Sequence, residues 1–150
     1  MENLFDTVSA DIKKAMLARD AVRLESLRGI KKEFLEAKTA KGSDGTLSDD
    51  RAIQILSKMV KQRRESAEIY TQQNRPELAQ AELAQAAVIE EYMPKQLSPE
   101  ELDAALREII ARVGATSPKE MGKVMGVASK ELAGKAEGRA ISAAVKALLP

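Results

Sequence analysis

Hydrophobic residues along the chain recur every three to four positions instead of alternating, which is the period of amphipathic helices. Five Pro and eight Gly separate these periodic stretches. The pattern predicts an all-α protein with seven helices and no strand. The helices are expected at about residues 3–19, 21–41, 48–73, 76–92, 98–113, 117–134 and 138–149.

The strongest boundary in this pattern lies between Tyr92 and Pro99. Pro94 and Pro99 cannot both lie inside one helix, and Ser98 with Glu101 has the spacing of a capping box that opens a new helix. Ser117 and Glu120, with Pro118 between them, have the same capping-box spacing and predict the start of another helix. We therefore expect an N-terminal four-helix domain at 1–93 and a C-terminal three-helix domain at 98–150. A C-terminal domain this short should be only marginally stable by itself, so we expect it to pack against the first domain or against a partner.

The fourth predicted helix is apolar from Leu83 to Ile89, with Gln85 as the exception. Amphipathic helices have one apolar stripe, whereas a helix that is apolar on most sides is usually covered on most sides. We therefore expect this stretch to be enclosed on more than one side.

Composition removes most catalytic chemistry. The 150 residues contain no Cys and no His, so the chain has no thiolate nucleophile, imidazole base or disulfide, and it lacks the usual zinc ligands. Glycine-rich phosphate loops, dinucleotide fingerprints and nucleophile elbows are also missing. Neighbouring carboxylates occur at Asp49-Asp50 and Glu90-Glu91, but adjacent helical side chains point about 100° apart. No catalytic residue, cofactor site or metal site is predicted.

The sequence offers no segment for a membrane. No uninterrupted run of about 18 apolar residues occurs, and the first eleven residues carry Glu2, Asp6 and Asp11 in place of a basic, then apolar, secretory signal. We expect a cytoplasmic protein without a membrane partner.

Basic residues are unevenly distributed although the net charge is only +1. Residues 13–41 contain nine basic and four acidic side chains, and residues 58–64 contain four basic and none acidic. Such stretches suit a phosphate backbone. Lys61 and Arg64, however, each precede a glutamate by four positions, the spacing of intrahelical ion pairs. Both interpretations stay open for this segment.

The last two predicted helices sort their charges onto one side. Met121, Met125, Ala128 and Leu132 share a face of the sixth helix, and its lysines share the opposite face. In the seventh helix the basic residues lie opposite Ile141, Val145 and Leu148. A modest positive surface would form when these helices pack, although solvent-facing charge is normal for any amphipathic helix.

Gly122 and Gly126 lie one turn apart beside the lysines of the sixth helix. Inside a helix each glycine costs up to about 1 kcal/mol relative to Ala. Their presence predicts that something approaches the helix backbone closely. Candidates are a neighbouring helix, a sugar–phosphate backbone or a partner protein.

Several of these segments together resemble the GatB/YqeY family. The central motif is Met121-Gly122-Lys123-Val124-Met125-Gly126, followed by Gly134-Lys135-Ala136-Glu137-Gly138-Arg139. Further matching pieces are Leu27-Arg28, Lys61-Gln62-Arg63 with Glu65-Ser66, and Tyr92-Met93-Pro94 followed by Gln96-Leu97-Ser98. The resemblance covers essentially the whole chain. Similar chains often have Leu and Asp where this one has Met93 and Glu137.

This resemblance implies an all-helical, two-part protein. Its C-terminal unit would be similar to the tail of the B subunit of the tRNA-dependent amidotransferase, a tail that helps to hold tRNA. The family label is a carbon–nitrogen ligase with glutamine as amide donor. The resemblance reaches only the tail and neither the kinase body nor the amidase subunit, so stand-alone catalysis is not expected.

The leading hypothesis is a non-catalytic helical protein that binds tRNA or a tRNA-handling enzyme. One alternative is an accessory component of an amidotransferase complex, and another is a protein-interaction or oligomerisation module. The predicted RNA- or partner-binding residues are the basic side chains and glycines of the last two helices and the loop between them: Lys119, Gly122, Lys123, Gly126, Lys130, Lys135, Arg139 and Lys146.

Overall fold

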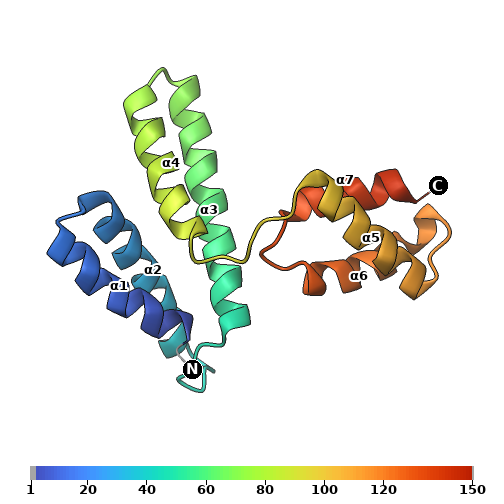
Figure 1. Cartoon of the computed structure of the whole chain (residues 1–150), viewed down its shortest axis with the longest axis horizontal. Coiled ribbons are helices and arrows are strands. Elements are labelled where there is room, and N and C mark those ends of the chain that lie inside the picture. The colour runs from blue at the N-terminus through green and yellow to red at the C-terminus, as the bar shows by residue number, and fades with distance from the viewer. Residues whose placement is uncertain (1–2, 150) are drawn as a thin grey trace. The chain divides into compact units, whose positions relative to one another are not determined.

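The computed structural model describes residues 3–149. The predicted domains also include Met1, Glu2 and Pro150, and the charge pattern of the first eleven residues includes Glu2; these three residues lie outside the described range. Within that range the chain forms seven α-helices and no strand, which confirms the predicted all-α class (Figure 1). The helices are α1 (Leu4–Ala18), α2 (Ala21–Thr39), α3 (Asp49–Gln72), α4 (Pro76–Glu90), α5 (Pro99–Val113), α6 (Met121–Glu131) and α7 (Gly138–Leu148).

The chain divides into two compact units, one up to Met93 and one from Pro94. In the first unit α1 packs against α2, and α3 packs along α4. The two hairpins meet chiefly where α2 lies against α4. A single hydrophobic core joins them, with side chains from every helix of the unit; its fully buried members include Val8, Leu27, Ile30, Phe34, Leu56 and Ile89.

Helix starts in this unit follow the capping chemistry of the sequence. The side chains of Asn3, Asp20 and Ser48 each accept a hydrogen bond from a backbone N–H in the first turn of the helix that follows. These bonds satisfy amide groups that have no partner inside a helix. Pro76 occupies the first turn of α4, where its missing N–H costs nothing.

Helix α4 is less enclosed than its apolar sequence predicts. Ala86, Val88 and Ile89 are buried, but Leu83 remains 43% exposed and Ala87 is exposed as well. The stretch is covered from two directions, since α4 packs chiefly on α3 and α2, but the side that carries Leu83 is left uncovered. Within residues 3–149 no further element of the first unit covers the face that carries Leu83.

In the second unit α5, α6 and α7 pack pairwise around a separate core. Leu106, Val124 and Val145, one from each helix, are completely buried at its centre. The stretch before α5 is tied to the loop after α6, since the Leu97 N–H donates to the Lys135 carbonyl oxygen over 2.8 Å. Each helix of the unit packs its apolar side into this core, and its charged side lies on the surface of the unit.

The two predicted capping boxes differ in the structure. Ser98 and Glu101 form the reciprocal pair at the start of α5, which confirms the first. The second was wrong: Ser117 makes no side-chain cap bond, and Pro118–Glu120 form a 3₁₀ turn before α6. The Glu120 carboxylate reaches back to accept from the Thr116 N–H over 3.1 Å. The Glu120 N–H, which a capping-box serine hydroxyl would accept from, donates instead to the Ser117 carbonyl oxygen over 3.0 Å.

Candidate functional site

The solvent-facing side of α6 gathers the glycines and lysines that the sequence singled out. Val124, Ala128 and Leu132 pack into the core on the other side of the helix, and Met121 and Met125 are partly buried against the same core. Because α6 turns about 100° per residue, the remaining positions point outward. All eight sequence-predicted residues are exposed: Lys119, Gly122, Lys123, Gly126, Lys130, Lys135, Arg139 and Lys146.

The backbone at Gly122 and Gly126 is open. A Cβ atom placed on either glycine would meet no atom of the chain within 4 Å, apart from α6 itself and the adjacent residues. The neighbouring helix that could have explained these glycines is thus not found in the described part of the chain. Both glycines carry their conformational cost without any intramolecular packing to offset it.

An open depression of about 540 Å³ lies over this part of α6. We call it the glycine depression. It brings together four of the eight predicted residues and adds three that the sequence analysis missed; its lining is Arg112, Gly122, Lys123, Gly126, Val127, Lys130 and Glu131. Lys119, Lys135, Arg139 and Lys146 are exposed but do not line it.

One wall of the glycine depression is an ion pair between two helices. Arg112, in the last turn of α5, contacts the Glu131 carboxylate at 2.8 Å and the Glu108 carboxylate at 3.7 Å. The hydrogen bond to Glu131, followed by its charge, raises the pKa of the Arg112 guanidinium above its ordinary value. Arg112 is consequently already paired and holds α5 beside the end of α6.

Lys123 and Lys130 differ from Arg112, because neither takes part in an ion pair with a described residue. Three cations and one carboxylate line the glycine depression, which leaves a formal charge of +2 at neutral pH. An exposed helix backbone between two unpaired ammonium groups offers electrostatic attraction together with close steric access. This combination suits an extended anionic ligand.

The basic stretch of α3 serves a different purpose. Arg63 donates from Nε to the Gln85 side-chain oxygen over 3.0 Å and approaches the Glu82 carboxylate at 3.8 Å. Arg64 pairs with Glu90. Both arginines thus link α3 to α4, which favours a structural role for this end of the basic segment.

The adjacent carboxylates likewise have structural partners. Asp49 accepts from the Leu4 N–H over 3.0 Å, and Glu91 receives two hydrogen bonds from the Arg23 guanidinium, at 2.8 and 3.3 Å. Among residues 3–149 no three side chains of the metal-ligating types come together. None of the described helices is long and apolar enough to cross a bilayer.

Comparison with known proteins places the chain in a family. The model of the YqeY-like protein family matches residues 5–149. A protein of Meyerozyma guilliermondii named altered inheritance of mitochondria protein 41, mitochondrial, is 33% identical over 126 residues, which are 81% of this chain and 65% of that protein. The proteins of the same name from Lachancea thermotolerans and Kluyveromyces lactis are 28% identical over 114 residues and 25% identical over 139 residues.

These alignments cover 72% and 91% of this chain and 58% and 71% of the respective relatives. The chain thus spans less than two thirds of the length of the first two relatives.

The relatives named above carry mitochondrial names, which contradicts the cytoplasmic localisation predicted from the sequence. That prediction was wrong because the features it used bear on secretion and membrane insertion, and they do not separate the cytosol from the mitochondrial interior. The family match spans both structural units and nearly the entire sequence. The chain therefore belongs to the YqeY-like protein family.

Proposed function

We propose that this protein is a non-catalytic helical binding protein whose C-terminal unit holds the phosphate backbone of tRNA. The observation that carries the proposal is the open backbone at Gly122 and Gly126 beside Lys123 and Lys130, neither of which forms an ion pair with a described residue. Two glycines on an exposed helix surface destabilise α6. A ligand from outside the chain that needs close access to the backbone gives them a reason to be there.

The chemistry of the glycine depression favours nucleic acid over a small ligand. It is open rather than enclosed, and Val127 is the one large aliphatic side chain in its lining. Small-molecule sites are concave and mostly apolar, whereas a nucleic-acid backbone needs cations on an accessible surface. The resemblance of the C-terminal unit to the tRNA-holding tail of the amidotransferase B subunit supports tRNA as the nucleic acid.

We propose further that the two compact units, four helices up to Met93 and three helices from Pro94, are functional domains, and that the second carries the principal tRNA contact, the glycine depression. Lys119, Lys135, Arg139 and Lys146 lie outside the glycine depression. In this proposal they add long-range attraction. Lys123 and Lys130 make the direct phosphate contacts.

The proposal is tested by measuring tRNA binding to the full chain at low and moderate salt, by electrophoretic mobility or fluorescence anisotropy. The double variant Lys123→Glu/Lys130→Glu should bind at least tenfold more weakly than wild type at low salt, because two attractions become repulsions. A matched control is Lys41→Glu/Arg75→Glu, which changes the net charge equally at two exposed positions of the first unit. Equal binding by both variants, or no binding by wild type, refutes the proposal.

The variant Gly126→Leu distinguishes tRNA binding from the alternatives in which this surface binds a partner protein. If the glycine depression receives a helix of a partner, Gly126→Leu should abolish that association and leave tRNA retention intact. Co-purification of amidase or kinase subunits with wild type, lost in Gly126→Leu, would replace tRNA binding by membership of an amidotransferase complex as the function of this surface.

A further inference from the structure

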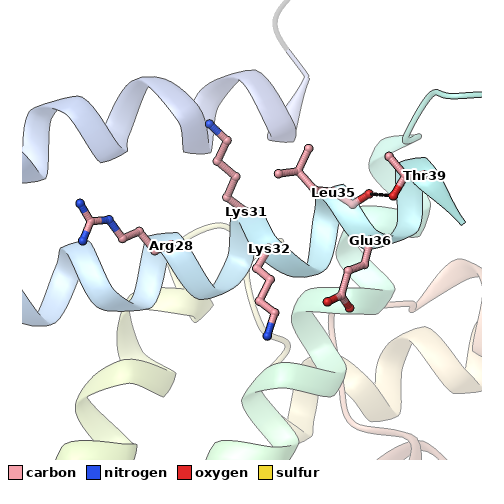
Figure 2. A pocket seen from close by; sticks show the side chains of 6 residues that line it. All are labelled: Arg28, Lys31, Lys32, Leu35, Glu36 and Thr39. Carbon is pink, nitrogen blue, oxygen red and sulfur yellow. Dashed lines mark hydrogen bonds between the residues drawn. The ribbon is translucent and has the colours of Figure 1, made fainter.

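A second group of basic side chains lies on the outer face of α2, in the first unit. Arg28, Lys31 and Lys32 fall within five consecutive residues, and Figure 2 shows their side chains extending from the helix. We call them the α2 cluster. With them, Leu35, Glu36 and Thr39 line an open depression of about 350 Å³.

The core of the first unit dictates this placement. Leu27, Ile30 and Phe34 are completely buried and hold α2 against the other helices. The helical period then turns Arg28 and Lys32 outward, where both are exposed. Lys38, in the last turn of the same helix, is engaged differently, since its Nζ lies 4.0 Å from the centre of the Phe5 ring.

The α2 cluster has no anionic partner in the described chain. No ion pair includes Arg28, Lys31 or Lys32, although Glu36 follows Lys32 at the four-residue spacing that favours one. Other basic residues of this unit, Arg23 and Arg63 among them, are paired with glutamates.

Like charges three and four positions apart on a helix repel each other. Arg28 therefore lies about one turn from both Lys31 and Lys32, with no ion pair to a described residue, and a ligand that carries several negative charges would relieve the repulsion.

The shape of this surface narrows the choice of ligand. Three cations and one carboxylate give the lining a formal charge of +2, and Arg28 and Lys32 are about 6 Å apart along the helix axis, at 1.5 Å per residue. The depression is open and not enclosed, so it suits an extended polyanion. Anionic bilayers are a poorer match, because Leu35, 42% exposed, is the one large apolar side chain in the lining; interfacial helices insert several.

We propose that the α2 cluster is a second contact for the phosphodiester backbone of nucleic acid, separate from the glycine depression. This inference rests on the proposed function, since it takes the same class of ligand. It assigns phosphate contacts to the N-terminal unit, to which the family resemblance assigns no ligand. Arg28 and Lys32 make the contacts, and Lys31 adds attraction from the side that faces α1 in Figure 2.

The test compares four full-length proteins in tRNA binding as salt is raised from about 50 to 200 mM. They are wild type, Arg28→Glu/Lys32→Glu, Lys123→Glu/Lys130→Glu and the charge-matched control Lys41→Glu/Arg75→Glu. The α2 variant should lose at least tenfold in affinity at low salt relative to the control. The slope of log affinity against log salt should become shallower by about 1.5, as expected for two lost phosphate contacts. Circular dichroism verifies folding, and Arg28→Gln/Lys32→Gln replaces the α2 variant if that variant unfolds.

Each outcome has a separate meaning. If the α2 variant binds like the control while the α6 variant is weakened, the α2 proposal is overturned and the proposed function stands. If wild type binds no tRNA, or neither variant differs from the control, both are overturned. Vesicles of phosphatidylserine provide the last arm. Co-sedimentation that Arg28→Glu/Lys32→Glu abolishes, with tRNA binding unchanged, would identify the α2 cluster as a membrane contact and overturn the nucleic-acid proposal.

Discussion

Replacing Gly126 by Ala should make the protein more stable and a weaker binder. Gly126 is the sixth of the eleven residues of α6, and an added Cβ meets no atom within 4 Å outside its own helix and neighbours. No steric penalty therefore offsets the gain in helix propensity, which is about 0.8–1 kcal/mol for Gly to Ala in a helix interior. Gly122 is the second residue of α6 and has the same free space, so its replacement should yield less.

The gain is large enough to measure. The unit that starts at Pro94 is short, and 1 kcal/mol raises the melting temperature of a domain of about 60–100 residues by roughly 4–8 °C. Thermal and urea unfolding followed by far-ultraviolet circular dichroism report the change for the whole chain. Amide hydrogen exchange across 121–132 assigns it to α6, where protection should increase.

The affinity for tRNA should fall in the same variant that gains stability. A methyl group at Gly126 separates an approaching phosphate backbone from the helix, so Gly126→Ala should weaken tRNA binding several-fold and Gly126→Leu should weaken it further. Ser129→Ala is the control, because Ser129 is exposed on α6 but does not line the glycine depression. It should stabilise slightly and leave binding unchanged.

Two results would refute this reasoning. A stabilised Gly126→Ala protein that binds tRNA like wild type would show that no ligand needs the open backbone. A destabilised one would show that the glycine has an intramolecular role.

Three further predictions concern other parts of the chain. Ser98→Ala should destabilise the protein by about 1 kcal/mol, whereas Ser117→Ala should have almost no effect in urea unfolding, because only Ser98 makes a cap bond; equal effects would contradict this. Tyr92→Phe should cost about 1 kcal/mol at neutral pH, because the Tyr92 hydroxyl donates to Asp11 over 2.6 Å. Burial and that bond raise the pKa of Tyr92 above its ordinary value of about 10, so the stabilisation is complete below about pH 10 and is lost as the pH rises through the folded-state pKa. Unfolding measured from pH 8 upward should show that loss in wild type and a smaller one in Tyr92→Phe, and parallel curves would count against it. Glu131→Gln removes the one carboxylate that lines the glycine depression, so tRNA affinity in anisotropy titrations should rise about two- to threefold at low salt and the gain should vanish at high salt; an unchanged affinity would show that the ligand does not contact this surface.

Helix content and helix ends were predictable from the sequence because they depend on neighbours in the chain. Ser48 and Ser98 cap the helices that follow them, and Gly114, with φ of 72°, ends α5 in the left-handed conformation. Such signals act over a few residues. The Ser117 prediction failed at this same scale, because the Glu120 N–H donates to the Ser117 carbonyl oxygen and the Glu120 carboxylate accepts from the Thr116 N–H, so neither bond of the capping box forms.

Half of the candidate surface was also recognisable in the sequence. Gly122, Lys123, Gly126 and Lys130 share the outward side of one helix, and helical period alone reveals that. Arg112 was missed because it belongs to another helix, and its place at the edge of the glycine depression depends on how α5 packs against α6. Packing of α3 beside α4 likewise brings Arg63 to Glu82, whereas Arg28 lines an open depression, although both arginines lie in basic stretches of the sequence.

The sequence by itself determined the α-helical class, the approximate helix limits and the side of α6 that faces solvent, because hydrophobic period and capping bonds are local properties. Only the tertiary structure decided which cations are neutralised, that Leu83 stays exposed, and that no described helix of the second unit covers the glycines of α6. These depend on distances between helices that are far apart in the chain. Side-chain packing in the two cores sets those distances, and no pattern along a single helix records them.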